Sequence, residues 1–356
     1  MATVIKNIDE LLKTMVTKTA SDLHLAVGSP PTVRIDGSLV SLDNGQPLSH
    51  QELQEMIFSI INFSQREELE KQKELDFSYS IPGFCRFRGN ALYQRGTMGC
   101  VFRAIPQRPL TLQELGFTNL ESFCKKPRGL VLVTGPTGSG KSTTLAAMID
   151  YINENQSVHI ITIEDPIEFL HRNKKSIIRQ RELGTDTLAF SNALKHVLRQ
   201  DPDVILVGEM RDLETISLAI TAAETGHLVF ATLHTTGASL TVDRIIDVFP
   251  PHQQQQVRIQ LSGILEGIVS QTLLPRSDGK GRICAMEIMV ATPAIRNLIR
   301  EGKTPQMVSM IQTGGQYGMV SLDMSLKALV QKGIVSFEEA LAKAANQDEF
   351  KKLLGR

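Results

Sequence analysis

Hydrophobic positions in the first part of the chain follow two different periods. Apolar side chains recur at the 3.6-residue spacing of an amphipathic helix over residues 5–19. Alternating runs such as LHLAV and PTVRIDG, interrupted by glycine and proline, then predict short strands joined by turns. A helical pattern over residues 51–72 and the strand-like runs DFSYSI, CRFRGNALYQ and GCVFRAI follow. We therefore expect a small α+β domain over residues 1–105.

The next stretch differs from what lies on either side of it. Residues 106–127 contain three prolines and no long apolar run, which is typical of a linker with at most a short helix. After it come four near-continuous apolar runs, GLVLVTG, SVHIITIED, PDVILVG and GHLVFATLH, separated by helical patterns. Such runs predict parallel strands covered on both faces by helices, and hence an α/β core.

Beyond about residue 258 the pattern turns mostly helical. The predicted helices cover residues 260–274, 293–300, 304–313, 321–332 and 336–346. We therefore expect a second domain over residues 128–356, with an α/β core and a helical C-terminal part.

Composition narrows the class of protein without naming its function. Lysine plus arginine number 38 and aspartate plus glutamate 38, so there is no net charge to recruit nucleic acid. The four cysteines lack CxxC spacing, which disfavours a zinc site or a disulfide framework. The N-terminus has no apolar export signal, and no apolar run reaches the roughly 18 residues of a spanning helix. We expect a cytoplasmic protein with no direct membrane insertion.

The segment GPTGSGKS matches the phosphate-binding loop G-x-x-x-x-G-K-[ST] and follows an apolar strand. Backbone N–H groups at its glycines can surround phosphates, Lys141 can reach the β- and γ-phosphates, and Ser142 can ligate Mg²⁺. The alternative is a simple glycine-rich turn, which the strand–loop–helix context disfavours. The predicted ATP-binding residues here are Gly135, Pro136, Thr137, Gly138, Ser139, Gly140, Lys141, Ser142 and Thr143.

Carboxylates follow two of the predicted strands. In DPDVILVGEMRD, Gly208 stands where a Walker B aspartate usually lies, and Glu209 follows it. Glu164 ends the strand in ITIEDPIEF, and parallel strands present their carboxyl ends to one crevice. We predict that Glu209 and Glu164 orient the attacking water or hold Mg²⁺ together with Ser142. The alternative for Glu209 is a solvent-facing cap of its strand.

Two histidines lie at opposite ends of the run GHLVFATLH. His234, at the carboxyl end, is placed to sense phosphate or to relay its state. His227, at the amino end, is a second nucleotide-binding candidate, but a core histidine with one hydrogen bond explains it equally well.

Arginine is the side chain best suited to neutralise charge on a transferring phosphoryl group. Arg88 and Arg103 lie on neighbouring predicted strands of the first domain. Arg199 follows Lys195 by four residues on one predicted helical face, and Arg211 comes just after Glu209. Each of these arginines could instead form a surface ion pair.

The order of these motifs resembles one family, the GspE/PilT secretion and pilus ATPases. The phosphate loop, the acidic stretch ITIEDPIEF, the glycine-containing Walker B segment and the histidine box GHLVFATLHTT occur in the family's order. The resemblance implies a PAS-like N-terminal domain, a RecA-like ATPase domain and a hexameric ring that uses ATP and Mg²⁺. It also implies that Arg88 and Arg103 act on nucleotide in their own subunit or the next.

Within that family the chain is similar to the pilus retraction ATPases of the PilT type over almost its whole length. SDLHL, GEMRDLETI and AIRNLIRE carry this similarity, although AIRNLIRE could simply bury one face of a helix. The resemblance implies type IV pilus retraction and twitching motility. The implied partners are a PilC-like platform protein of the inner membrane, a PilU-like paralogue and an extension ATPase.

Three other functions remain open from the sequence. The first is a PilU-like accessory ATPase. The second is a related secretion or nucleic-acid motor, although the absence of net charge and of a basic stripe argues against nucleic acid. The third is a ring component that does not hydrolyse ATP, which the intact phosphate loop disfavours.

Overall fold

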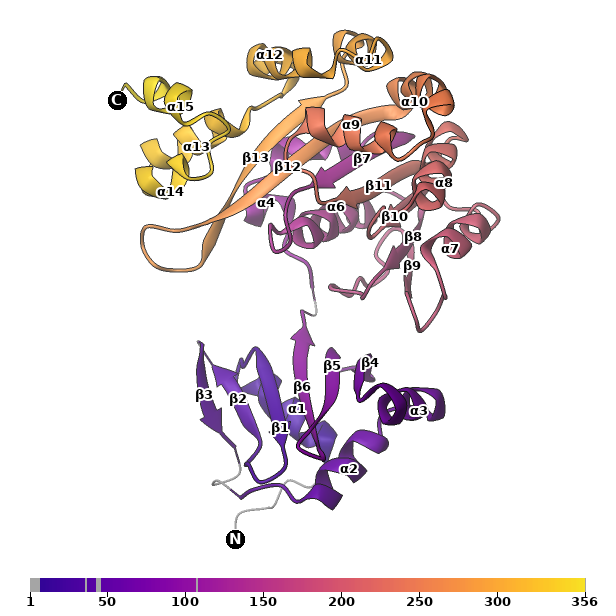
Figure 1. Cartoon of the computed structure of the whole chain (residues 1–356), viewed down its shortest axis with the longest axis vertical. Helices are drawn as coiled ribbons and strands as arrows, with labels where there is room; N and C mark the ends of the chain where they lie inside the picture. The colour runs from indigo at the N-terminus through magenta and orange to yellow at the C-terminus, as the bar shows by residue number, and fades with distance from the viewer. Residues whose placement is uncertain (1–6, 36, 43–45, 107, 356) are drawn as a thin grey trace. The chain divides into compact units, whose positions relative to one another are not determined.

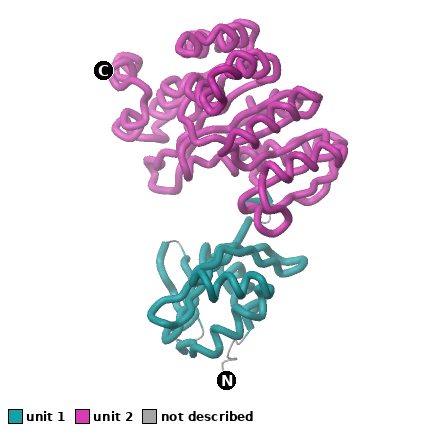
Figure 2. Tube along the Cα trace, turned by 45° about the vertical axis from the view of Figure 1, so that its right-hand side comes forward, with its two compact units in different colours: residues 1–108, 168–170 teal, residues 109–167, 171–356 magenta. Residues whose placement is uncertain are grey.

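The computed structural model describes residues 7–35, 37–42, 46–106 and 108–355, which form two compact units (Figures 1 and 2). The first unit runs to Arg108 and includes Glu168–Leu170. The second comprises Pro109–Ile167 and the chain from His171 onward. No helix in the described part of the chain is long and apolar enough to cross a membrane.

The first unit is built on a six-stranded sheet in which every neighbouring pair is antiparallel, in the order β3-β2-β1-β6-β5-β4. Its strands are β1 (Asp22–Ala26), β2 (Thr32–Ile35), β3 (Ser38–Ser41), β4 (Glu74–Ile81), β5 (Cys85–Gln94) and β6 (Thr97–Ile105). Its helices are α1 (Ile8–Thr17), α2 (His50–Phe58) and α3 (Phe63–Gln72). The predicted start of the first helix at residue 5 lies outside the described residues.

The single helix expected over residues 51–72 is wrong, because two helices occupy this range. The chain turns after Phe58, and Asn62 then starts α3 with a capping box. Asn62 Oδ1 accepts from Gln65 N at 2.9 Å, and Gln65 Oε1 accepts from Asn62 N at 3.0 Å. Such reciprocal bonds stabilise a new helix start.

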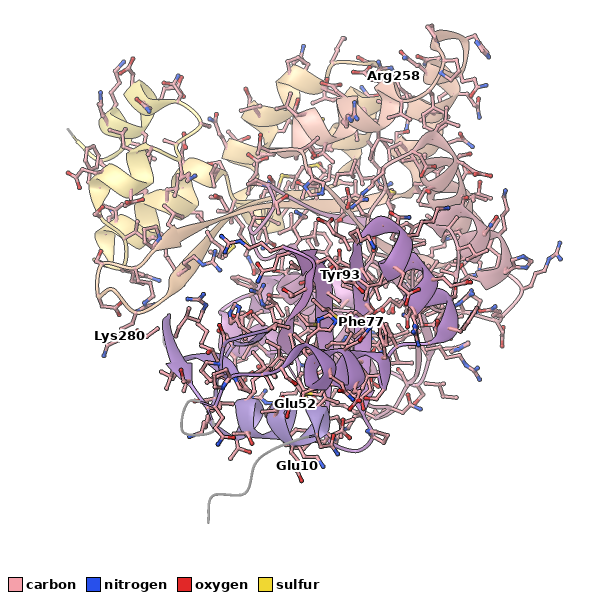
Figure 3. All side chains as sticks on the ribbon, turned by 60° about the horizontal axis from the view of Figure 1, so that its bottom comes forward. Glu10, Glu52, Phe77, Tyr93, Arg258 and Lys280 are labelled. Atoms are coloured by element: carbon pink, nitrogen blue, oxygen red, sulfur yellow. The ribbon has the colours of Figure 1, made fainter. Side chains whose placement is uncertain are left out.

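The core of the first unit lies between the sheet and its helices. Leu11, Leu12 and Met15 of α1 are fully buried in it. The ring of Phe77, labelled in Figure 3, packs edge-on against Phe102 with ring centroids 5.8 Å apart. Buried and exposed residues alternate along the first half of β4 and most of β5, which accounts for the alternating sequence pattern there.

The second unit is built on a seven-stranded sheet in the order β13-β12-β7-β11-β10-β8-β9. All neighbours are parallel except β12 and β13, which form an antiparallel pair. The strands are β7 (Gly129–Thr134), β8 (His159–Glu164), β9 (Ile177–Glu182), β10 (Val204–Val207), β11 (Leu228–Leu233), β12 (Leu265–Pro275) and β13 (Arg282–Val290).

Helices cover both faces of this sheet (Figure 1). Leu130 and Leu132 of β7 pack with α7, α8, α9 and α10, whereas Val131 and Val133 pack with α4, α5 and α6. The helices are α4 (Leu112–Leu115), α5 (Glu121–Cys124), α6 (Lys141–Asn155), α7 (Phe190–Val197), α8 (Leu213–Glu224), α9 (Ala238–Asp247), α10 (Pro251–Ile264), α11 (Pro293–Arg300), α12 (Met307–Thr313), α13 (Leu322–Gln331), α14 (Phe337–Leu341) and α15 (Gln347–Leu353). Short 3₁₀ turns are η2 (Thr118–Leu120), η3 (Thr304–Gln306) and η4 (Gly315–Tyr317).

The stretch between the two units is shorter than the linker expected over residues 106–127. The second unit begins at Pro109, and α4, η2 and α5 all belong to it. Phe117, Leu120 and Phe123 are buried against β7 and α6. Short segments rich in proline can thus contribute to a core when their few apolar residues find a sheet face to cover.

The helix expected over residues 260–274 is wrong for most of its length. Helix α10 ends at Ile264, and the next residue begins the strand β12. The run LEGIVSQTLL is apolar enough for either a buried helix or a buried strand, so periodicity alone does not decide. Pairing with β7 on one side and β13 on the other makes it a strand.

The fold class expected from the sequence is confirmed: an α+β part is followed by an α/β part with a helical C-terminal region. The segment AIRNLIRE forms most of α11, where Ile295 and Ile299 are fully buried and Leu298 is partly buried. Those positions of the motif therefore serve the core. Helix α15 was not anticipated.

Candidate functional site

The phosphate loop (residues 135–142) connects β7 to α6. Its glycines Gly135, Gly138 and Gly140 have φ values of 138°, 76° and 90°, a region that favours glycine. The loop thus needs glycine at these places to curl back before the helix. Among the described residues no side chain caps the start of α6, so its first N–H groups can bind an anion.

Lys141, the first residue of α6, reaches back across the phosphate loop. Its Nζ donates to Gly135 O at 2.9 Å and to Pro136 O at 3.1 Å. Ser142 and Thr143 occupy the first turn of α6 and are half-buried. An ammonium group and two hydroxyls are thereby gathered where the helix begins, which suits a phosphate group with its Mg²⁺.

The strands β7, β8, β10 and β11 are parallel, so their carboxyl ends lie along one edge of the sheet. The phosphate loop follows β7, Glu164 ends β8, Glu209 comes shortly after β10, and His234 comes directly after β11. These residues, distant in sequence, therefore share one edge, as the sequence predicts for a parallel sheet.

Glu209 is held between two basic side chains. Its Oε1 lies 3.0 Å from His234 Nε2, and its Oε2 lies 2.7 Å from a terminal nitrogen of Arg211. Arg211 is also 3.9 Å from a carboxylate oxygen of Asp165. Burial by itself raises the pKa of Glu209, but the hydrogen bond and charge of Arg211, helped by His234, bring that pKa below its usual value. Glu209 is therefore ionised at neutral pH and can accept a proton or a metal ion.

Glu164 is oriented by its neighbours. Its Oε1 accepts from Thr162 Oγ1 at 2.7 Å and from Gln180 Nε2 at 3.0 Å. Two donors on one oxygen fix the side chain at the edge that carries the phosphate loop. A second carboxylate is thus available there for water or Mg²⁺.

The glycine at the usual aspartate position has a steric reason. Gly208 N donates to Ile163 O at 2.7 Å, so the ends of β10 and β8 lie close together. A Cβ at position 208 would lie 3.0 Å from Ile163 O and 3.2 Å from the Cα of Glu164. An aspartate there would push apart the two strand ends that carry Glu164 and Glu209.

Comparisons with known proteins agree with this geometry. Residues 1–278 match the model of the type II/IV secretion system protein family. The chain is 55% identical to the type IV pilus retraction ATPase PilT of Pseudomonas aeruginosa, over 97% of this chain and all of that protein. It is 41% identical to the type IV pilus ATPase PilU of the same organism, over 97% of this chain and 91% of PilU. The chain belongs to the type II/IV secretion system protein family.

A solved structure in the family supports the same assignment. The crystal structure of the pilus retraction motor PilT with bound ADP superposes with a TM-score of 0.90 at 46% identity. The alignment covers 97% of this chain and 99% of that one. The fold is therefore that of the secretion ATPases.

The phosphates of a nucleotide fit the phosphate loop of this secretion ATPase family member. Ser139 Oγ is buried and has no hydrogen-bond partner among the described residues, and the start of α6 carries uncapped N–H groups. Space also surrounds Gly138, where an added Cβ would meet no described heavy atom within 4 Å. Donors without partners beside open space are what a phosphate group requires.

Two predicted nucleotide-binding residues lie elsewhere in this family member. His227 precedes β11 and therefore lies at the opposite, amino-terminal edge of the sheet, roughly 20 Å along the strand from the phosphate loop. Its Nδ1 lies 2.9 Å from Ala222 O, so this partly buried histidine has the hydrogen bond expected of a structural residue. Arg199 is exposed in the turn after α7, on the way to the amino end of β10. The prediction that it shares a helical face with Lys195 is wrong, because α7 ends at Val197.

Arg88 and Arg103 lie directly opposite each other on β5 and β6, so both project from one face of the first unit's sheet. Arg103 donates to Asp22 at 2.8 Å, and Arg88 lies 3.9 Å from Asp76. Both side chains are more than half exposed. They form the ion pairs that the sequence left as an alternative.

Three polar residues near the site were not anticipated from the sequence. Gln271 Nε2 donates to Ser139 O at 2.8 Å within the phosphate loop. Ser270 Oγ accepts from Gly237 N at 2.8 Å, and Glu287 Oε1 accepts from Ala238 N at 2.7 Å, just beyond the histidine box. Burial raises the pKa of Glu287. The sequence did contain a signal for two of them, because Ser270 and Gln271 interrupt an apolar run. It was missed because a helix was expected there.

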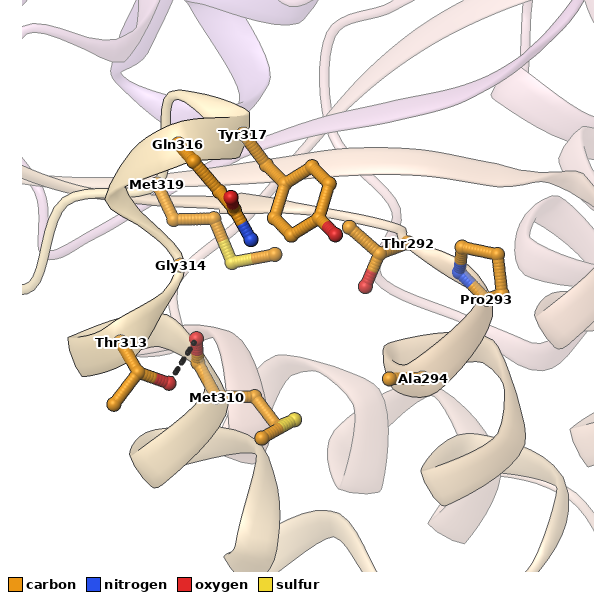
Figure 4. Close-up of a pocket in the computed structure, with 9 residues that line it drawn as sticks. All are labelled: Thr292, Pro293, Ala294, Met310, Thr313, Gly314, Gln316, Tyr317 and Met319. Atoms are coloured by element: carbon orange, nitrogen blue, oxygen red, sulfur yellow. Dashed lines mark hydrogen bonds between the residues drawn. The ribbon is translucent and has the colours of Figure 1, made fainter.

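A groove of about 410 Å³ lies apart from this site (Figure 4). It is lined by Thr292, Pro293, Ala294, Met310, Thr313, Gly314, Gln316, Tyr317 and Met319. Its first residues follow Val290, which pairs with Gly267 near the amino end of β12. Because β12 runs parallel to β7, the groove lies toward the edge opposite the phosphate loop.

Proposed function

We propose that this protein is an ATP-hydrolysing motor that powers retraction of type IV pili. The observation that carries the proposal is the ionised Glu209, held by Arg211 and His234 on the same sheet edge as a complete phosphate loop. An oriented carboxylate beside a phosphate-binding loop is what water attack on a γ-phosphate requires. The match in sequence and fold to PilT supports retraction as the use of that chemistry.

The chain's own residues divide the work of hydrolysis. N–H groups of the phosphate loop and Lys141 bind the phosphates, and Ser142 with Glu209 and Glu164 would hold Mg²⁺ and its waters. Bound Mg²⁺ would supply positive charge beside the phosphate oxygens. Glu209 orients the attacking water and accepts its proton, and His234 and Arg211 keep that carboxylate in place and ionised.

Pilus retraction requires that ATP hydrolysis be coupled to movement within the protein. In the proposed motor six copies form a ring, and Arg88 and Arg103 would exchange their ion pairs with Asp76 and Asp22 for the γ-phosphate of their own subunit or the next. The two units, which meet in sequence at Arg108 and Pro109, would move against each other in that step. The ring would act on the cytoplasmic side of the inner membrane, docked to a PilC-like platform protein, with a PilU-like paralogue and an extension ATPase as further partners.

An accessory PilU-like role is the second candidate. It has direct support from the 41% identity to PilU over nearly the whole chain. The 55% identity to PilT over a similar length favours the principal retraction role.

Purified protein tests the chemistry. Lys141→Ala should abolish ATP turnover while the protein still unfolds in one cooperative transition, and Glu209→Gln should lower kcat by roughly 10²–10⁴-fold while nucleotide still binds. Lys352→Ala, an exposed lysine of α15, is the matched control and should leave turnover unchanged. Normal hydrolysis by Lys141→Ala would refute the site. Salt-sensitive stimulation by DNA would instead point to a nucleic-acid motor.

Cells test the biological role. A strain lacking the gene should carry long pili that do not retract, and the wild-type gene should restore retraction whereas Glu209→Ala should not. Normal retraction in the deletion strain would leave the ATPase chemistry standing and reassign the protein to an accessory role or to another secretion machine.

A further inference from the structure

Gln271 is a polar residue in a place where apolar residues are expected. It lies on β12, one strand in from the edge of the seven-stranded sheet, and only 3% of it is exposed. The residues from Gly267 to Val269 before it are buried. Because burial removes an amide from water, such a residue needs hydrogen-bond partners inside the protein.

The side-chain amide of Gln271, whose backbone pairs with Met286 of β13, donates to the phosphate loop. Its Nε2 donates to Ser139 O, a residue 132 positions away in sequence, at 2.8 Å. A Cβ added to Gly140 would lie 3.2 Å from this Nε2, and a Cβ added to Gly135 would lie 2.2 Å from the backbone oxygen of Gln271. The strand therefore supports the loop near its first and its last glycine, and the two glycines make that close approach possible.

The bond to Ser139 O determines where a neighbouring N–H points. In a trans peptide the C=O and N–H groups point in opposite directions. Holding the carbonyl of Ser139 toward β12 therefore turns the N–H of Gly140 away from β12. Gly140 precedes α6, so this N–H belongs to the group that binds anions at a helix start.

Three buried polar atoms, on the phosphate loop, at the end of β7 and on Gln271 itself, have no hydrogen-bond partner among the described residues. They are Gln271 Oε1, Ser139 Oγ and Thr134 Oγ1. Unpaired buried polar atoms are uncommon, and a bound ligand is one way to supply the missing partner. Two of the three are hydroxyls that can donate, which suits a ligand with acceptor oxygens.

We propose that Gln271 is a positioning residue for phosphate binding, because it holds the Ser139 carbonyl so that the Gly140 N–H is presented to the nucleotide. This inference rests on the proposed function, since it takes the phosphate loop to be a nucleotide site. Gln271 acts through the loop and touches no reacting atom.

The test compares two glutamines, each of which donates a side-chain N–H to a backbone carbonyl oxygen. Gln271→Met removes the amide and keeps the length of the side chain. Gln156→Met is the control, because Gln156 Nε2 donates to Cys124 O at 2.8 Å, after the far end of α6. Equilibrium titration with ADP should show binding weakened about tenfold in Gln271→Met alone, the value of one oriented hydrogen bond. KM for ATP should rise more than kcat falls, and both variants should unfold at similarly lowered temperatures.

A second variant supplies a readout that packing would not change. In Gln271→Glu the carboxyl can donate to Ser139 O only while protonated. ADP affinity of this variant should therefore fall between about pH 5.5 and pH 8.5, relative to wild type. This pH dependence also decides the matter if Gln271→Met does not fold.

The outcomes separate the two proposals. If wild-type protein binds ADP and hydrolyses ATP, but Gln271→Met binds ADP within about twofold of wild type, the positioning role is overturned and the proposed function stands. A flat pH response of Gln271→Glu, equal to that of wild type, overturns it as well. If wild-type protein binds no nucleotide, the proposed function fails and this inference fails with it.

Discussion

Gly208 offers a test of how tightly the two strand ends at the site are packed. A Cβ at this position would meet Ile163 O at 3.0 Å and Glu164 Cα at 3.2 Å, and both are backbone atoms that cannot rotate away. Overpacking of this kind destabilises the folded state by about 1–3 kcal/mol. Alanine also lowers the conformational entropy of the unfolded chain, which offsets about 0.4–1 kcal/mol of that loss. We therefore expect Gly208→Ala to lose about 1–2 kcal/mol of stability.

A thermal unfolding measurement tests this expected loss of stability. In a domain of roughly 150–250 residues, each kcal/mol shifts the midpoint by about 2–4 °C, so Gly208→Ala should unfold about 2–8 °C below wild type. The strand ends that carry Glu164 and Glu209 must shift as well, and small displacements of oriented groups lower rates by up to about 10²-fold. In Gly208→Ala, kcat should therefore fall together with the thermal unfolding midpoint.

Gly263→Ala is the matched control for this prediction. Gly263 is exposed near the end of α10, and an added Cβ would meet no described heavy atom within 4 Å. Alanine is favoured over glycine in a helix by about 0.5–1 kcal/mol, so this variant should unfold at or slightly above the wild-type temperature. If Gly208→Ala unfolds at the same temperature as Gly263→Ala and hydrolyses ATP at the wild-type rate, the steric explanation for glycine at position 208 is wrong.

Two further predictions concern ion pairs. The lowered pKa of Glu209 adds stability that is present above its unfolded pKa and is lost as pH falls through the folded value. Arg211→Ala should raise that pKa, so the acid limb of the kcat/KM profile should move to higher pH; an unmoved limb would show that Glu209 is not the titrating base. Arg296 donates to the carbonyl oxygens of Ser262 and Gly263 and to Glu266. Arg296→Ala should therefore lower the free energy of unfolding by about 2–3 kcal/mol in chemical denaturation, whereas exposed Arg300→Ala on the same helix should change it by less than about 0.5 kcal/mol; equal effects would contradict the anchoring role.

Local patterns were sufficient for the parts of this protein whose residues act close together in sequence. The phosphate loop is one uninterrupted segment, and its glycines, Lys141 and Ser142 are arranged by the turn from β7 into α6. The strands β7, β10 and β11 were predictable because all their residues are buried, so their sequences are continuously apolar. The common edge of Glu164, Glu209 and His234 then follows from parallel pairing alone.

Arginine roles could not be read in the same way. A charged side chain has no periodic signal that tells a nucleotide contact from an ion pair. Arg211 proved to bind Glu209, whereas Arg103 proved to bind Asp22, 81 residues earlier in the chain. Only the partner in space separates these cases.

The sequence by itself determined the family, the phosphate loop and the order of the acidic and histidine segments, because each is a short motif with its chemistry built in. Tertiary structure alone decided that LEGIVSQTLL is a strand, since its apolar residues suit a helix or a strand until β7 and β13 pair with it. That pairing brings Gln271 to Ser139. The close approach of β8 to β10 leaves no room for a Cβ at position 208, which explains the glycine there. Both contacts join residues that are far apart in sequence, and only the folded sheet brings them within hydrogen-bonding or van der Waals distance.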